Sequence, residues 1–217
     1  MHIPRENTSG IDVLPFDEAL ERATQPQTDY DVTKWLYVPP VYDEYRYILG
    51  TKGNNPLICV GINPSTAAPD DLDPTLQSAQ RIALYNGYDS FLMFNVYAQR
   101  ATRPDDMERT LNPWMHGENM KAFAHLLSLC GEHPAVWAAW GAIIEKRDYL
   151  YDFVREMLSI GDEHGAVWYH AGSISKAGHP HHPLYLKSTT PLEPFDTASY
   201  LNMMSRRHPS DVQPAIP

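Results

Sequence analysis

The stretch Pro56-Leu-Ile-Cys-Val60, followed at once by Gly61-Ile-Asn-Pro-Ser-Thr66, decides the fold. Its first half is a short, continuous apolar run that ends in turn-forming residues, which predicts a strand buried on both faces. Three further runs of the same kind follow, at residues 90–94, 135–139 and 166–169. Strands of this kind are typical of parallel sheets that helices cover.

Helical patterns fill the intervals, at residues 76–86, 119–129 and 142–160. The intervals are long enough for the crossover helices that parallel strands require. The sequence therefore predicts an α/β fold, a three-layer α/β/α sandwich on a four-stranded, mainly parallel central sheet. A short helix at 16–23 precedes it, as does an edge strand with Tyr45, Tyr47 and Leu49 that ends at Gly50. We expect an N-terminal extension at 1–30, a single domain at 31–205 and a mobile tail at 206–217.

Composition excludes several classes of protein. The chain has 217 residues, of which 43% are hydrophobic, and no run of about 18 apolar residues that could cross a membrane. Cys59 and Cys130 are too few for a disulfide scaffold. The net charge of −10 opposes non-specific binding to nucleic acid, so any such binding requires a local basic rim. We expect a cytoplasmic monomer with no membrane partner.

Ligands of such sheets bind beyond the carboxyl ends of the strands, where two asparagines follow the first two runs. Gly61 allows a close approach of backbone or ligand, and the Asn63 amide beside Ile62 is a candidate to position a water molecule. The side-chain amide of Asn95 can pair with the edge of a base. Plain turns at both asparagines are the alternative interpretation. Trp140-Gly141, after the third run, is predicted to be a packed turn.

The densest signal is His179-Pro-His-His-Pro-Leu-Tyr-Leu186. A metal site, with help from His164 or His170, is one interpretation. The prolines leave little freedom to wrap His179, His181 and His182 around one ion, and the spacing matches no zinc signature. We therefore expect neither a metal nor a cofactor, and instead a single histidine that stabilises developing negative charge.

Charged residues supply the remaining candidates. Asp70, Asp71 and Asp73 are the nearest source of a general base, or else a solvated loop that caps the next helix. Lys146 lies on the helix after the third run, where it either contacts a phosphate or belongs to a solvated face.

Taken in order, these segments resemble the uracil-DNA glycosylase superfamily and the domain-of-unknown-function family 1643. Gly61-Ile-Asn-Pro64 is similar to the first superfamily motif, and Phe91-Leu-Met-Phe-Asn95 with Arg100 to the second. Ala138-Ala-Trp-Gly141 resembles the end of the third strand, which a Lys-bearing helix follows. His182-Pro-Leu-Tyr-Leu186 occupies the place of the last motif. The resemblance covers about residues 56–186.

The resemblance implies a glycosylase-like domain and a DNA glycosylase activity that removes an extruded uracil-like or modified pyrimidine, including a phage-specific one. Its partner would be double- or single-stranded DNA that carries the target base. Asn95 would read the base, His182 would support the leaving base, and Asn63 would position the water, with one of the three aspartates as base. The first motif would line the base pocket through Gly61 and Ile62.

The resemblance also suggests contacts with the rest of the DNA. Leu184 or Tyr185 would fill the gap that extrusion leaves, and an aromatic residue such as Tyr97 would stack on the base. The net charge of −10 limits the contacts with phosphates to a small local patch of about three to five. The candidates for these contacts are Arg100, Arg103, Lys146 and Lys187. Two rival functions remain open: a hydrolase of free nucleosides or nucleotides, and a non-catalytic module that binds a modified base.

Overall fold

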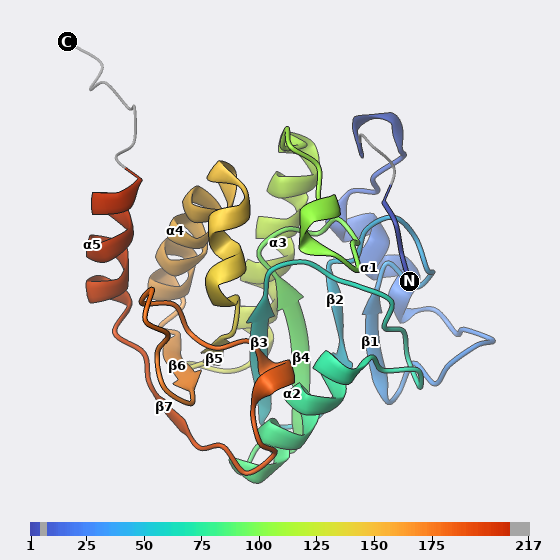
Figure 1. Cartoon of the computed structure of the whole chain (residues 1–217). Coiled ribbons are helices and arrows are strands. Elements are labelled where there is room, and N and C mark those ends of the chain that lie inside the picture. The colour runs from blue at the N-terminus through green and yellow to red at the C-terminus, as the bar shows by residue number, and fades with distance from the viewer. Residues whose placement is uncertain (5–7, 209–217) are drawn as a thin grey trace.

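The computed structural model describes residues 1–4 and 8–208, which form an α/β fold on one seven-stranded mixed sheet (Figure 1). The strand order is β1-β2-β4-β3-β5-β6-β7. At its centre lie the four predicted apolar runs, which are parallel to one another. They are β3 (Pro56–Gly61), β4 (Ser90–Asn95), β5 (Ala135–Ala138) and β6 (Val167–Ala171).

The expectation of four strands is wrong, because three short antiparallel strands extend the sheet. β1 (Trp35–Val38) and β2 (Ile48–Thr51) lie at one edge, and β7 (Leu192–Pro194) lies at the other. Their three or four residues are too few to show a periodic pattern. β2 begins later than predicted and is not the edge strand, since β1 pairs with its outer side.

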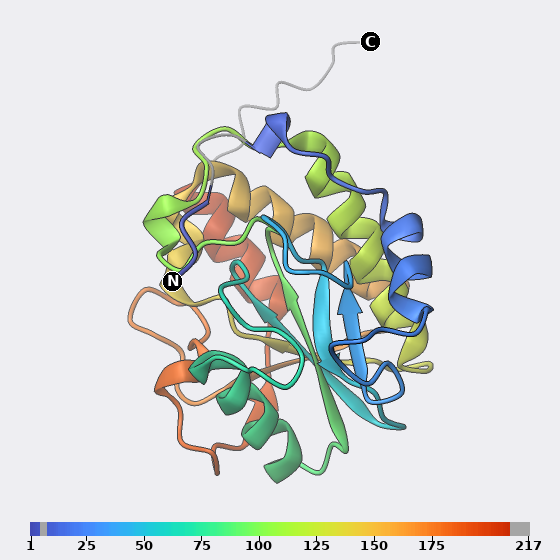
Figure 2. The same cartoon turned by 90° about the vertical axis from the view of Figure 1, so that its right-hand side faces the viewer.

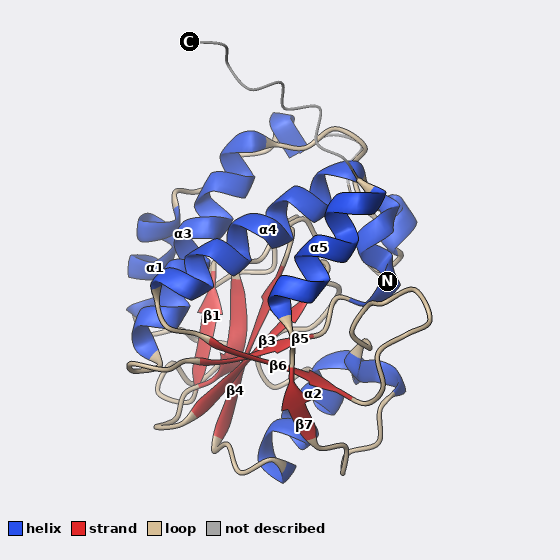
Figure 3. Ribbon diagram, turned by 90° about the vertical axis from the view of Figure 1, so that its left-hand side faces the viewer, coloured by secondary structure: helices blue, strands red, loops and turns tan. Residues whose placement is uncertain are grey.

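Helices cover both faces of the sheet (Figures 2 and 3). On one face, α2 (Pro74–Tyr85) packs Leu76, Ala79 and Ile82 into a core with β3 and β4. The other face carries the larger core. Its helices are α1 (Phe16–Thr24), α3 (Pro113–Leu129), α4 (Asp148–Glu163) and α5 (Thr197–Arg207).

Four short 3-10 helices complete the chain, and one of them divides a predicted helix. These are η1 (Thr8–Gly10), η2 (Pro104–Asp106), η3 (Gly141–Lys146) and η4 (Pro183–Tyr185). The helix expected at 142–160 is interrupted at Arg147, whose backbone is extended, so η3 and α4 are separate elements. Gly141 begins η3 with φ +63°, next to the fully buried Trp140, as the predicted packed turn requires.

Helices lie near both ends of the described part of the chain. Phe16, Ala19 and Ala23 of α1 are buried in the larger core, so this helix of the predicted extension at 1–30 packs against the domain. Arg206 and Arg207 belong to α5, and the rest of the predicted tail, beyond residue 208, lies outside the described residues. Within the described part of the chain, no helix is long and apolar enough to span a membrane.

Candidate functional site

A pocket of about 410 Å³ opens at the carboxyl ends of β3 and β4. The loop after β3, the start of α2, the segment after β4 and the 3-10 helix η4 form its walls. Among its polar lining residues are Arg46, Asn63, Asp73, Asn95 and His182. It therefore brings together a carboxylate, an imidazole, a guanidinium and two amides from distant parts of the sequence.

The floor of the pocket is set by the register of β3 and β4. Gly61 and Asn95 are the last residues of these strands and pair directly. A Cβ atom at Gly61 would lie 2.6 Å from Met93 Cε and 2.9 Å from Asn95 Nδ2, so glycine is needed for both side chains to keep their places. Ile62 also lines this part of the pocket.

Asn95 is 1% exposed, and its hydrogen bonds fix the orientation of its amide. Its Oδ1 accepts a hydrogen bond from Arg46 Nη2 at 3.3 Å, and its backbone carbonyl accepts one from Asn119 Nδ2 at 2.9 Å. Among the described residues, none bonds to Asn95 Nδ2. The amide therefore keeps a hydrogen-bond donor for an acceptor on a ligand.

Arg46 is the site residue that the sequence analysis missed. It lies between Tyr45 and Tyr47, which are buried in the larger core, and its own side chain points to the opposite side, as alternation along extended chain requires. The sequence did offer a signal for it, because Arg46 is a charged residue between two tyrosines that alternate in a predicted strand. Burial, reinforced by the nearby charge of Arg100, lowers the pKa of Arg46 to about 9.

Asn63 is half-buried and holds two loops together. Its Nδ2 donates to the carbonyl of Ala101 at 2.7 Å and to that of Pro64 at 3.0 Å. With both donors engaged, the Oδ1 atom is left as an acceptor at the pocket wall. Asn63 can therefore orient a water molecule, but an amide cannot take up its proton.

The structure separates the three candidate aspartates. Asp73 caps α2, with its Oδ1 accepting from Leu76 N at 3.0 Å, and it lines the pocket. Asp70 instead binds Lys34 Nζ at 2.8 Å and Trp35 Nε1 at 3.1 Å, and Asp71 is exposed outside the pocket. Of the three, Asp73 alone is in a position to act on a ligand in the pocket.

The three histidines are separated in the same way. His179 is fully buried between Tyr200 Oη and Glu145 Oε1, and His181 does not line the pocket. His182 does line it, and its Nδ1 accepts from Leu184 N at 3.4 Å, which leaves the proton of the neutral ring on Nε2. Burial lowers the pKa of His182, against the opposing charge of Asp73, so the ring is neutral near pH 7.

Two residues expected to contact DNA are buried instead. Arg100 is fully buried, with its guanidinium donating to the carbonyls of Ser65 and Ala67 and to Tyr37 Oη, so it cannot reach a phosphate. Tyr97 is also fully buried and donates to Glu108, so it cannot stack on a base. Both side chains belong to the buried segment that follows β4.

The other expected contacts lie at the surface. Lys146 is paired with Asp105 at 2.8 Å and does not line the pocket, whereas Arg103 and Lys187 are exposed and have no ion pair within the described residues. Leu184 and Tyr185, on η4, are 42% and 81% exposed at the pocket rim. A pair of exposed apolar side chains beside a polar pocket is suited to contact with an apolar or aromatic surface.

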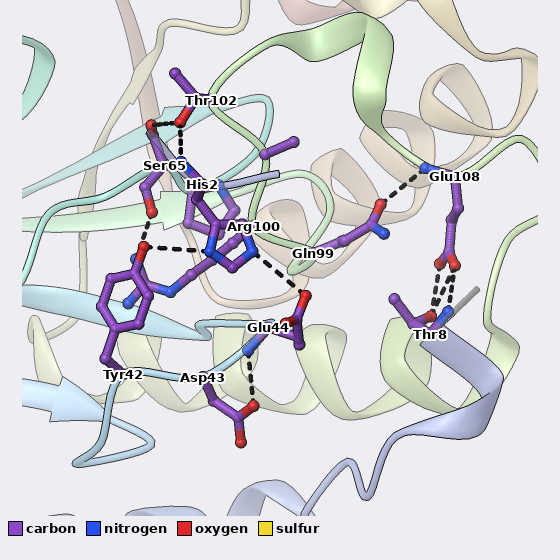
Figure 4. A network of polar contacts seen from close by, with 12 residues as sticks. His2, Thr8, Tyr42, Asp43, Glu44, Ser65, Gln99, Arg100, Thr102 and Glu108 are labelled. Carbon is purple, nitrogen blue, oxygen red and sulfur yellow. Dashed lines mark hydrogen bonds and ion pairs between the residues drawn. The ribbon is translucent and has the colours of Figure 1, made fainter. Parts of the chain in front are cut away.

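The N-terminal segment braces the wall of the pocket that carries Ser65 and Thr102 (Figure 4). The backbone N–H of His2 donates to Thr102 Oγ1 at 2.7 Å, and Ser65 Oγ donates to the same oxygen at 3.2 Å. Arg100 Nη1 donates a hydrogen bond to the carbonyl of Ser65 (Figure 4). This wall is therefore fixed by contacts from three distant segments of sequence.

Comparisons with known proteins identify the family of the chain. In the part of the chain that the structure describes, no three His, Cys, Asp or Glu side chains gather as a metal site would require. No curated protein and no solved structure matches the chain. A family described as "Protein of unknown function (DUF1643)" matches residues 46–184, a range that contains every polar pocket residue named above. The chain belongs to this family.

Proposed function

We propose that this protein is a DNA glycosylase that hydrolyses the N-glycosidic bond of an extruded uracil-like or modified pyrimidine and leaves an abasic site. The observation that carries the proposal is the meeting of Asp73, Asn95 and His182 in one pocket. The exposed Leu184 and Tyr185 at its rim add to this support. A uracil-DNA glycosylase-like arrangement of the α/β layers is part of the same proposal.

The reaction makes three demands on the pocket. Cleavage of the bond leaves an oxocarbenium-like sugar and an anionic base, and a water molecule must attack the sugar C1′. In our proposal Asn63 Oδ1 holds this water and the Asp73 carboxylate takes its proton. His182 donates to an oxygen of the departing base from Nε2, which carries the proton of the neutral ring.

Recognition of the base and of the strand is assigned to other groups. Asn95 Nδ2 donates to a carbonyl oxygen of the base, and Leu184 or Tyr185 fills the gap left in the stack. Arg103 lies between two pocket-lining residues, Thr102 and Pro104, and with Lys187 it supplies contacts to phosphates. Roles of this kind suit either anti-phage defence or base repair.

A second candidate function is hydrolysis of free nucleosides or nucleotides. It is favoured by the net charge of −10 and by the loss of Arg100 as a phosphate contact. Such a substrate needs no basic surface beyond the pocket.

One experiment separates the two. Duplex and single-stranded oligonucleotides that carry uracil or a 5-substituted pyrimidine are incubated with the protein, and alkali then cleaves any abasic site. Free nucleosides are followed in parallel by chromatography, with His182→Ala as the inactive control. Cleavage of oligonucleotides alone supports the glycosylase, and base release from nucleosides alone supports the alternative. Base-dependent binding without release in either arm would leave a non-catalytic binding module.

A further inference from the structure

Two buried guanidinium groups lie close together at the pocket floor, where Arg46 lines the pocket and Arg100 does not. Arg46 Nη1 and Arg100 Nη1 both donate to the carbonyl of Ala67, at 3.3 and 3.2 Å. Arg46 is 1% exposed and Arg100 is fully buried. Their other hydrogen-bond acceptors are Asn95 Oδ1, the Ser65 carbonyl and Tyr37 Oη, all of them neutral groups.

Neither arginine has a carboxylate partner within the described residues. Asp73 lines the same pocket as Arg46 but forms no ion pair with it, and Arg46 Nε is enclosed without any hydrogen-bond partner. Buried charges in proteins are ordinarily paired, because removing an ion from water without a counter-charge is costly. This chain has ten more acidic than basic residues, yet none of the described ones forms an ion pair with either arginine, and Asp73 acts on Arg46 only through its charge at longer range.

We propose that the pocket floor is a receptor for an oxyanion on the ligand, bound beside Asn95 by Arg46. The inference rests on the proposed function and narrows its substrate class. The substrate is either a pyrimidine whose base carries an acidic group such as a carboxylate, or a nucleotide whose phosphate reaches the pocket floor, rather than a neutral base or nucleoside.

The geometry explains why Arg46 rather than Arg100 meets the ligand. Arg46 lines the pocket, and its two hydrogen bonds to Ala67 and Asn95 leave further N–H donors of its Nη groups free. Arg100 does not line the pocket and is held by three acceptors. It contributes positive charge from behind, and in a buried site that charge is little screened by salt.

Binding of matched pairs of small molecules tests the proposal without any hydrolysis. The first pair is 5-carboxyuracil and its neutral isostere uracil-5-carboxamide. The second pair is deoxyuridine 5′-monophosphate and deoxyuridine. Affinities are measured by calorimetry on the full chain, on Arg46→Gln and Arg46→Lys, and on Arg81→Gln. Arg81 is an exposed arginine of α2 outside the pocket, so its replacement is a matched change of charge.

We expect the anionic member of at least one pair to bind at least about tenfold more tightly, as hydrogen bonds to charged groups warrant. Arg46→Gln should abolish this preference, while Arg46→Lys and Arg81→Gln should retain it. Preference in the first pair assigns the anion to the base, and preference in the second assigns it to a nucleotide phosphate.

Equal affinities within both pairs for the unmodified chain would overturn the proposal, whatever the variants do. A preference that survives in folded Arg46→Gln would overturn it as well. Neither result bears on whether the protein releases bases from DNA, because the oligonucleotide assay measures that separately.

Discussion

His182 and His181 are adjacent, yet only His182 lines the pocket. We expect His182→Ala to lower the rate of base release by about 100-fold, because a donor to developing charge contributes to the transition state rather than to DNA affinity. Duplex binding should change by no more than a few-fold. Single-turnover excision and gel-shift assays measure the two effects. His181→Ala is the matched control, and a larger loss in that variant would contradict the assignment.

The pH dependence follows from the burial of the same side chain. Burial lowers the pKa of His182 below 6.5, so the neutral donor is present at all higher pH values. Base release should be constant above pH 6.5 and fall as the pH drops through the lowered pKa, because a protonated Nδ1 no longer accepts the hydrogen bond from Leu184 N that orients the ring. The unfolded chain takes up this proton first, so His182 also destabilises the fold as the pH falls below 6.5. A pH profile of kcat/KM checks the first effect, and a midpoint above 6.5 would be inconsistent with it.

The two roles of Asp73, as the N-cap of α2 and as the proposed base, can be tested separately. Asparagine is also a good N-cap, so Asp73→Asn keeps the start of α2 while it removes the carboxylate. We expect base release to fall by about 100-fold or more, with the thermal midpoint nearly unchanged. Asp71→Asn is the control with the same change of charge outside the pocket. If Asp73→Asn retained full activity, the water would need another base.

At the scale of elements, the ends of β3 and β4 act as one unit, because their register places Gly61 against Asn95. Gly61→Ala should displace the Asn95 amide and Met93, at a cost of about 1 to 3 kcal/mol in the free energy of unfolding. The affinity for the target base should fall at least tenfold, while the affinity for plain duplex stays the same. Chemical denaturation and gel-shift assays give the two values. An unchanged base affinity would mean that Asn95 does not read the base.

At the scale of the whole molecule, the net charge of −10 limits how the protein holds DNA. Of the four basic side chains first expected to contact phosphates, Arg100 is buried and Lys146 is paired with Asp105. Arg103 and Lys187 remain, so the slope of log K against log salt should be about −2, at about −0.9 per phosphate. Filter binding over a salt series measures it. A slope near −8 would require a broad basic face.

The central part of the fold could be predicted from the sequence, because long apolar runs and helical periods are local signals. The four runs became β3, β4, β5 and β6; α3 includes its predicted segment, and α2 covers all of its own except the last residue, Asn86. The strands β1 and β7 could not be predicted, because three or four residues are too few to show the alternating pattern of a strand. Their pairing depends on neighbours that are distant in sequence.

The candidate site divides in the same way. The sequence by itself determined that Asn63, Asn95 and the histidine segment each come after a buried strand, since the apolar runs along the chain show where the strands end. Only the tertiary structure decided that His182 and Asp73 line the pocket, that Arg100 and Tyr97 do not, and that Arg46 does. The physical reason is that burial and pairing depend on contacts between segments far apart in sequence. The shared carbonyl of Ala67, which joins two arginines 54 positions apart, has no trace in either local sequence.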